Sequence, residues 1–153
     1  GKKFKLYKFR SMVPNADEIL SKTLETDKVA AEQWRKYQKL ENDPRITKMG
    51  NILRKTSLDE LPQLLNILTG DISFVGPRPI IDDEIKKYGM NKDKLLSVTP
   101  GLTGWWACNG RSCTSYEDRM KLELFYVDNR SILLDIKVFI KTFISVIKRN
   151  GAK

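Results

Sequence analysis

Pro62 restricts the fold of this chain more than any other residue, because it follows a pattern that would otherwise begin an unbroken helix. Residues 57–60 (SLDE) match a capping box, in which the Ser and Glu side chains satisfy free backbone N–H groups at a helix start. Pro62 would remove one backbone hydrogen bond of that helix and crowd the turn before it. We therefore predict a break, with Asp59 and Glu60 at or just before the start of a helix over residues 62–69.

The rest of the sequence predicts an α+β fold that is predominantly helical, with short strands and amphipathic interfacial helices. A length of 153 residues fits one compact domain over residues 1–153. Alternating apolar and basic residues predict a strand over 4–12, and Asp27 is a candidate helix cap. The other expected elements are two helices within 16–40, helices over 46–55, 82–88, 115–127 and 133–149, a strand over 72–75 and a loop over 99–112.

The charge and the missing residue types limit the possible functions. A net charge of +9 indicates an anionic partner, which could be nucleic acid, an acidic membrane surface or a phosphorylated small molecule. The chain has no histidine, which excludes Ser-His-Asp and Cys-His catalysis and histidine-ligated zinc. Cys108 and Cys113 are too few for a zinc site or a disulfide framework, so a reducing cytosol is the default expectation. Catalysis would fall to carboxylates, lysines, tyrosines or a metal ion bound by oxygen.

The acidic pair and its basic neighbours indicate phosphate chemistry. Adjacent carboxylates diverge by about 100° on a helix, so Asp59 and Glu60 can take different roles. One could attack phosphorus while the other holds Mg²⁺, which takes oxygen ligands. Arg54 precedes the pair, and Arg78 stands between two prolines that stiffen its backbone for gripping a phosphate. The structural alternative, in which the pair only caps a helix, stays open at this point.

Further basic residues are candidates for contacts with phosphate or nucleotide. Lys8 and Arg10 lie on the basic face of the strand predicted at 4–12, and Arg45 precedes the helix predicted at 46–55. Arg111 follows a glycine-rich stretch that contains two tryptophans, which would suit a nucleotide base and its phosphates. The tryptophans are equally consistent with a place in the core or at a membrane interface.

The last predicted helix has an apolar side and a group of lysines, and two interpretations remain for it. It either packs on the core as a terminal helix or lies in the headgroup layer of an anionic membrane. No run in the sequence reaches the roughly 18 to 20 apolar residues that cross a bilayer. Its apolar residues are Ile136, Phe139, Ile140, Phe143 and Ile147, and its lysines are Lys137, Lys141 and Lys148.

Several segments, in order along nearly the whole chain, resemble the bacterial sugar transferases that move a hexose 1-phosphate onto polyprenyl phosphate. Residues 13–42 resemble the larger members, such as the undecaprenyl-phosphate galactose phosphotransferases, whose C-terminal part is catalytic. The matching segments are KFRSM at 8–12, DPRIT at 43–47, LRKTSLDELPQLLNILTGDISFVGPRP at 53–79, TPGLTG at 99–104, NGR at 109–111 and LDIK at 134–137.

The resemblance implies a two-step displacement. Asp59 would attack the β-phosphate of a UDP-sugar, release UMP and hold the sugar phosphate as an acyl phosphate until the lipid phosphate takes it. Glu60 would ligate Mg²⁺, Arg54 and Arg78 would bind phosphate, and Arg111 would contact the nucleotide. The product would enter synthesis of an exopolysaccharide, capsule or similar surface glycan.

The resemblance also implies a place at the cytoplasmic face of the bacterial inner membrane. Members of the family carry an apolar, membrane-inserted segment before KFRSM, whereas residues 1–3 alone precede this strand here. We therefore expect the chain to be a fragment of a longer protein. The competing functions are a nucleic-acid-binding module, which the charge alone supports, and a scaffold without turnover. We expect no nucleic-acid partner, because acidic residues alternate with the basic ones and no binding motif accompanies them.

Overall fold

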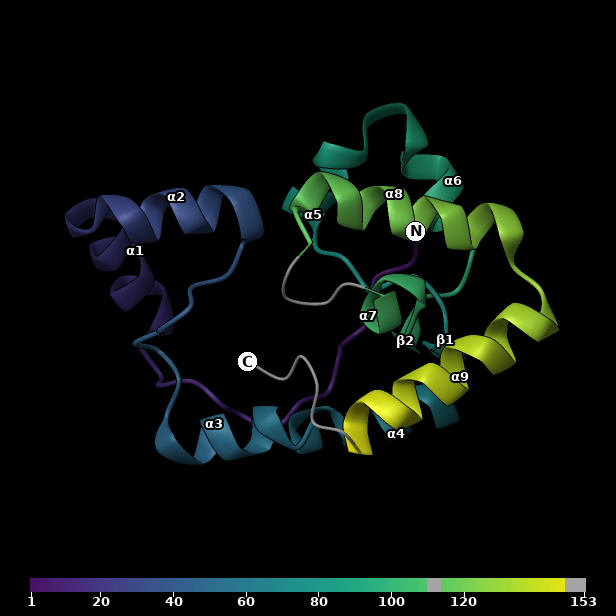
Figure 1. The fold of residues 1–153 in the computed structure, drawn as a ribbon, viewed down its shortest axis with the longest axis horizontal. Helices are drawn as coiled ribbons and strands as arrows, with labels where there is room; N and C mark the ends of the chain where they lie inside the picture. Colours follow the sequence, from purple (N-terminus) through teal and green to yellow (C-terminus); the bar gives the residue numbers. More distant parts are fainter. Residues whose placement is uncertain (110–113, 148–153) are drawn as a thin grey trace.

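The structure, a computed structural model, describes residues 1–109 and 114–147, with the side chains of 146 and 147 outside the description. It confirms the predicted fold class, which is α+β and mostly helical. Figure 1 shows helices α1 and α2 to one side of a core formed around a small sheet. The helices before this sheet are α1 (Ala16–Thr26), α2 (Lys28–Tyr37), α3 (Lys48–Lys55), the 3-10 turn η1 (Leu58–Glu60) and α4 (Gln63–Leu68).

The sheet has two parallel strands, β1 (Ser73–Val75) and β2 (Gly101–Thr103), with Ser73 opposite Gly101. Glycine is required at this junction, because a Cβ on Gly101 or Gly104 would overlap the backbone of Gly76. The later helices surround the sheet. They are α5 (Asp82–Ile85), the 3-10 helix η2 (Lys86–Asn91), α6 (Lys92–Leu96), α7 (Trp105–Asn109), α8 (Tyr116–Asn129) and α9 (Ile132–Ile147).

Helix α9 packs against both strands of the sheet, and its Val138 is fully buried. The Tyr126 hydroxyl on α8 donates to the Asp135 carboxylate of α9 at 2.7 Å and so joins the two helices. Helices α7, α8 and α9 therefore enclose the strands and fix the loops that leave them.

The break predicted at Pro62 is confirmed. Ser57 adopts a left-handed conformation (φ 58°), so the chain turns after α3 and enters the 3-10 turn η1 instead of a long helix. Pro62 stands at the N-cap position of α4. The Ser57 side chain makes no capping hydrogen bond, so the capping box that the sequence matches does not form. Asp59 and Glu60 thus lie on a short turn between two helices.

The strand predicted over residues 4–12 is wrong. This segment is extended, and its one ladder contact is an isolated bridge between Met12 and Ile46. Its other backbone partners are single groups on helical segments: the Tyr7 N–H donates to the Asn66 side-chain oxygen, and the Phe9 N–H donates to the Asp59 carbonyl. Among residues 1–109 and 114–147, no strand lies alongside to continue a ladder, so the alternating pattern does not become a sheet.

The loop predicted over residues 99–112 is also wrong in part, because it contains β2 and α7.

The two helices predicted within residues 16–40 are confirmed as α1 and α2. The Asp27 carboxylate caps α2, as predicted, by accepting from the N–H groups of Val29 (2.8 Å) and Ala30 (3.1 Å). Asn15 stands at the N-cap position of α1 without a side-chain capping bond.

Many large apolar side chains remain exposed, and helices α3, α4 and α9 carry a group of them. Figure 1 shows these three helices along one side of the molecule, opposite α8. On α4, Leu68 is 83% exposed, and on α9, Phe143 is 61% exposed. Within the described part of the chain, no helix has both the length and the apolar character needed to cross a membrane.

Candidate active site

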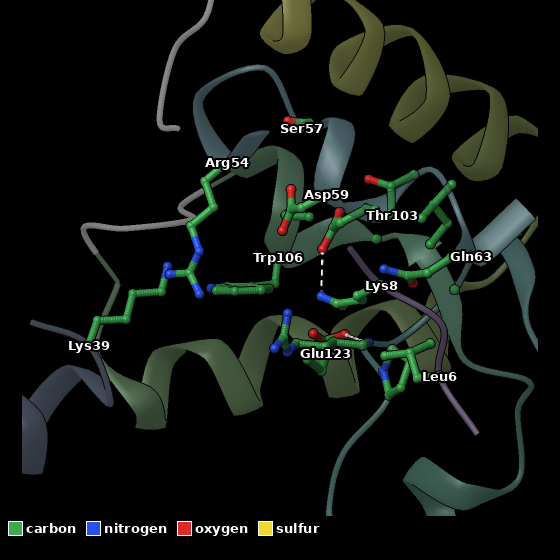
Figure 2. Close-up of a pocket in the computed structure, with 17 residues that line it drawn as sticks. Leu6, Lys8, Lys39, Arg54, Ser57, Asp59, Gln63, Thr103, Trp106 and Glu123 are labelled. Atoms are coloured by element: carbon green, nitrogen blue, oxygen red, sulfur yellow. Dashed lines mark hydrogen bonds and ion pairs between the residues drawn. The ribbon is translucent and has the colours of Figure 1, made fainter. Parts of the chain in front are cut away.

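A pocket of about 270 Å³ lies where the N-terminal segment, the η1 turn, the loop after β1 and helices α7 and α8 meet. Figure 2 shows Asp59, Lys8, Gln63 and Trp106 converging on it from different parts of the chain. Five of the residues singled out by sequence line this pocket: Lys8, Arg54, Asp59, Glu60 and Arg78.

Asp59 is partly buried at the wall of the pocket. Burial and the negative charge of neighbouring Glu60 raise the pKa of the Asp59 carboxyl above its usual range, whereas Lys8 and Arg54 act in the opposite direction. The backbone of Asp59 is fixed as well, because its carbonyl accepts from the Phe9 N–H at 2.9 Å. The carboxylate is therefore held in place beside two cations, as a nucleophile toward phosphorus requires.

Glu60 lies next to Asp59 and points to a different partner. Its Oε1 accepts from the Lys8 Nζ at 2.9 Å, and about a third of each side chain is exposed. The N-terminal segment thereby contributes a cation to the same pocket wall as the acidic pair. The position of Lys8 depends on the extended segment and needs no sheet.

Arg54 reaches the pocket from the last turn of α3. Its Nε donates to the buried Ser11 hydroxyl at 2.9 Å, which leaves the rest of the guanidinium at the pocket. Gly50 explains the close approach of α3 to this segment, because any Cβ at that position would overlap the Ser11 carbonyl. The helix and the extended segment together therefore orient Arg54.

Arg78 lies on the proline-flanked loop after β1, and a buried carboxylate supports it from below. The Arg78 backbone N–H donates to Glu123 Oε2 at 3.2 Å. Glu123 is 2% exposed, and its burial raises the pKa of the carboxyl to about 7. Glu123 thus lines the pocket under the loop that presents Arg78, and its carboxyl can change protonation state near neutral pH.

Sequence reasoning missed Glu123. One signal was present: the buried positions of α8, Tyr116, Arg119, Glu123 and Tyr126, follow the three- and four-residue spacing of a single helix face. Charged residues of a helix are usually exposed to solvent, so the presence of Glu123 alone did not indicate a site. The two tyrosines at the ends of the face indicate that it turns inward.

Arg45 and Arg10, which were also predicted as contacts for phosphate or nucleotide, do not line this pocket. Arg45 is buried and makes two short hydrogen bonds to the Asp43 carboxylate, at 2.8 and 2.7 Å, while its guanidinium lies 5.1 Å from the Trp34 ring centre. Arg10 is exposed on the extended segment. Arg111 lies outside the described residues.

The two adjacent tryptophans, Trp105 and Trp106, lie in different surroundings. Trp106 is 8% exposed and lines the pocket, so an aromatic wall is present there. Trp105 stacks on Phe125 with a distance of 5.4 Å between ring centres and does not line the pocket. Figure 2 shows Trp106 between Lys39 and Asp59.

The acidic residues of the described chain form no cluster of three or more that would enclose a metal ion. Mg²⁺ is commonly held by one or two protein carboxylates together with phosphate oxygens of the substrate. Glu60, partly exposed at the pocket wall beside Asp59, fits that type of site. The donor set is therefore compatible with a cation that arrives with a diphosphate.

Comparison with known proteins gives a consistent result over the whole chain. Residues 1–149 match the model of the family described as "Bacterial sugar transferase". The chain is 49% identical over 152 residues to the UDP-galactose-lipid carrier transferase of Erwinia amylovora. The aligned residues make up 99% of this chain and 32% of that protein. It thus spans about a third of that relative's length.

Two further relatives have related names. The exopolysaccharide production protein ExoY of Sinorhizobium fredii is 44% identical, with 99% of this chain and 67% of the relative covered. The UDP-glucose:undecaprenyl-phosphate glucose-1-phosphate transferase of Escherichia coli K12 is 40% identical, with 97% of this chain and 30% of the relative covered.

Proposed function

Because this chain belongs to the bacterial sugar transferase family, we propose that it moves a hexose 1-phosphate from a UDP-sugar to a polyprenyl phosphate. The observation that carries this proposal is the position of Asp59, partly buried in a pocket that Lys8, Arg54 and Arg78 also line. The names of the relatives, which include a sugar donor and undecaprenyl phosphate, support the substrate classes.

In the first step, a carboxylate oxygen of Asp59 forms a bond to the β-phosphorus of the UDP-sugar. The bond from that phosphorus to the oxygen bridging the two phosphates breaks, and UMP leaves with the electron pair. The sugar phosphate stays on Asp59 as an acyl phosphate. Arg54, Arg78 and Lys8 lower the barrier because they offset the negative charge of both reactants.

In the second step, a phosphate oxygen of the lipid attacks the same phosphorus. The bond to Asp59 breaks, the carboxylate is restored, and the sugar leaves as a lipid-linked diphosphate. The carboxylate must be ionised to begin each cycle, and the cationic neighbours favour that form against the effect of burial.

Glu60 would hold Mg²⁺, because its carboxylate lies beside Asp59 and shares the pocket wall. A bound magnesium ion would supply further neutralisation of the diphosphate charge. Lys8, which donates to Glu60 in this structure, would contact the phosphate oxygens from the same pocket wall.

The lipid substrate requires contact with a membrane, and we propose that the exposed apolar side of α3, α4 and α9 provides it, at the cytoplasmic face of the inner membrane. Four of the five residues predicted as one apolar side of α9 are at least half exposed, namely Ile136, Phe139, Ile140 and Phe143, and the side chain of the fifth, Ile147, lies outside the description. This exposure favours the interfacial interpretation of the helix over packing on the core. The reaction would begin assembly of an exopolysaccharide or capsule.

The test is release of UMP from a panel of UDP-sugars in the presence of Mg²⁺ and a polyprenyl phosphate. Asp59→Asn should lower turnover by at least roughly a thousandfold, because the amide is not a nucleophile toward phosphorus. The same panel identifies the sugar.

The matched control is Asp82→Asn, which changes an exposed carboxylate on α5 and should keep turnover. Circular dichroism would establish that both variants are folded. Turnover retained in folded Asp59→Asn, or a trapped sugar phosphate attached to another residue, would refute the covalent mechanism.

A further inference from the structure

A second, smaller pocket of about 130 Å³ adjoins the first. It lies between the end of α2 and helices α7 and α8, and three residues line both pockets: Lys39, Arg78 and Trp106. Figure 2 shows Lys39 and Trp106 at the edge of the first pocket. The two pockets are therefore neighbours, close enough for two groups of one ligand.

Arg119 of α8 lines this second pocket and is 8% exposed. Its guanidinium lies close to two aromatic rings, 4.8 Å from the Trp106 ring centre and 5.1 Å from that of Tyr116. Its ion pair with Glu84 is long, with Nη1 3.4 Å from Glu84 Oε1. Within the described residues, Nε and Nη2 are buried and have no hydrogen-bond acceptor.

Buried donors without acceptors are uncommon in folded proteins, because each costs free energy. Nε and one terminal nitrogen of a guanidinium form a fork that matches two oxygens of one phosphate or carboxylate. The contacts with the two aromatic rings restrict the movement of the fork. The arrangement is that of a donor pair prepared for an oxyanion.

The charge of the pocket points to the same class of ligand. Lys39, Arg78 and Arg119 line it, against one carboxylate, Glu84. An excess of positive charge inside a concave, poorly solvated site attracts anions. The volume is below the 300 to 1,000 Å³ that is typical of pockets for whole drug-sized ligands. It therefore suits a single group of a larger substrate.

We propose that this second pocket binds the phosphate of the uridine monophosphate part of the donor, with Arg119 as the residue that recognises it. The inference rests on the proposed function, in which this phosphate leaves when Asp59 attacks its neighbour. Arg78, shared by both pockets, would then contact the reacting phosphate and the leaving one.

The lipid substrate also carries a phosphate, but its position argues against this pocket. Helices α3, α4 and α9, which carry exposed apolar side chains, lie on the opposite side of the molecule from α8 and α2 (Figure 1). A lipid phosphate would approach from that apolar side. The water-soluble nucleotide is therefore the ligand that fits the second pocket.

The experiment measures binding of UMP, uridine and farnesyl phosphate to the 153-residue chain by calorimetry, without a sugar donor. Arg119→Gln should weaken UMP binding by about 10- to 100-fold, as expected for loss of a charge-assisted hydrogen-bonded pair. The affinity for uridine, which lacks the phosphate, should fall by less than about threefold. Binding of farnesyl phosphate should not change.

Lys121→Gln is the matched control, because it removes one positive charge from an exposed position of the same helix. It should leave the affinity for UMP within about twofold. The proposal is overturned if folded Arg119→Gln binds UMP as the unaltered chain does. Equal losses for UMP and uridine, or a loss for farnesyl phosphate alone, would overturn it as well.

A measurement on the unaltered chain covers the case in which Arg119→Gln does not fold. The Nε–H resonance of Arg119, assigned through its bonds by nuclear magnetic resonance, should shift on addition of UMP and of inorganic phosphate but not of uridine. No shift at saturating UMP would overturn the proposal.

These outcomes are separate from those of the turnover assay. A chain that releases no UMP from any UDP-sugar, yet binds UMP through Arg119, would refute the proposed function and keep the second pocket. UMP release that depends on Asp59, with UMP binding that is independent of Arg119, would support the proposed function and refute the proposal for the second pocket.

Discussion

Arg45, between α2 and α3, and Arg119, on α8, are buried to almost the same degree, with 7% and 8% exposed. Both stack on a tryptophan, at 5.1 Å from Trp34 and 4.8 Å from Trp106. They differ in their acceptors. Arg45 makes two short bonds to one carboxylate, whereas Arg119 has one long contact with Glu84.

This difference separates a structural arginine from one suited to a ligand. Burial alone would raise the pKa of Asp43, but the hydrogen bonds and charge of Arg45 outweigh that effect and lower it below its usual range. The pair between α2 and α3 is therefore complete within the protein. Helix α8 contains two charges without such compensation, Arg119 and Glu123, and both line pockets.

The largest effect on stability is expected where the pairing is complete. Arg45→Gln should lower the free energy of unfolding at pH 7 by about 3 kcal/mol, because it leaves the Asp43 carboxylate buried without its partner. Denaturant unfolding measures the loss, and Arg35→Gln, an exposed residue of α2, is the control. The UMP affinity of the folded protein should not change. A loss of UMP affinity without a loss of stability would show that Arg45 serves the ligand and not the fold.

The next effect depends on pH. The pKa of Glu123 is raised to about 7 from 4.5, so the folded protein keeps a proton that the unfolded chain has lost between these values. Stability should therefore fall as the pH rises from 4.5 to 7, by about 3 kcal/mol at 1.36 kcal/mol per pKa unit. Glu123→Gln removes the titrating group and should be the more stable protein at pH 8, with the difference absent below pH 4.5.

Unfolding curves of the two proteins across this pH range measure the effect. Glu117→Gln, which changes an exposed carboxylate on the same helix, is the control. Parallel curves for the unaltered chain and Glu123→Gln would show that the buried carboxylate does not titrate in this range.

The smallest effect on stability is expected at Arg119. Within the described residues, the Arg119 guanidinium has two buried donors without acceptors, and the free-energy cost of burying them disappears with the side chain, so Arg119→Met should change the free energy of unfolding by less than about 1 kcal/mol. Thermal unfolding measures it beside Arg45→Met. Equal losses in the two variants would remove the contrast between a structural and a ligand-binding arginine.

Local signals predicted much of the helical part of the fold. Asp27 caps α2 through two N–H groups, and Pro62 ends one helical segment and begins the next, because both residues act on neighbouring backbone. The strand β2 was missed because three residues hold too little pattern, and β1, the partner that makes them a strand, lies 28 residues earlier. The segment 4–12 shows the opposite case: it has the alternating pattern without a neighbouring strand.

The candidate site was predictable where one dense segment supplied it. Asp59, Glu60, Arg54 and Arg78 fall within residues 53–79, and the structure brings all four to one pocket. The contribution of α8 was not predictable, because a charged helix residue reveals its burial only through contacts with distant segments. Glu123, for example, accepts from the Arg78 backbone, 45 positions away.

The buried amide of Asn66 has a consequence for the order in which the molecule matures. It accepts from the Tyr7 N–H and donates to the Lys5 carbonyl at 2.7 Å, across 59 and 61 positions. During synthesis Lys5 and Tyr7 leave the ribosome well before Asn66 does. At about 5 to 20 residues per second, the delay before these hydrogen bonds can form is several seconds. Helices α1 and α2 have all their local contacts by then. The nascent chain should therefore acquire helical structure first and the ability to bind nucleotide later.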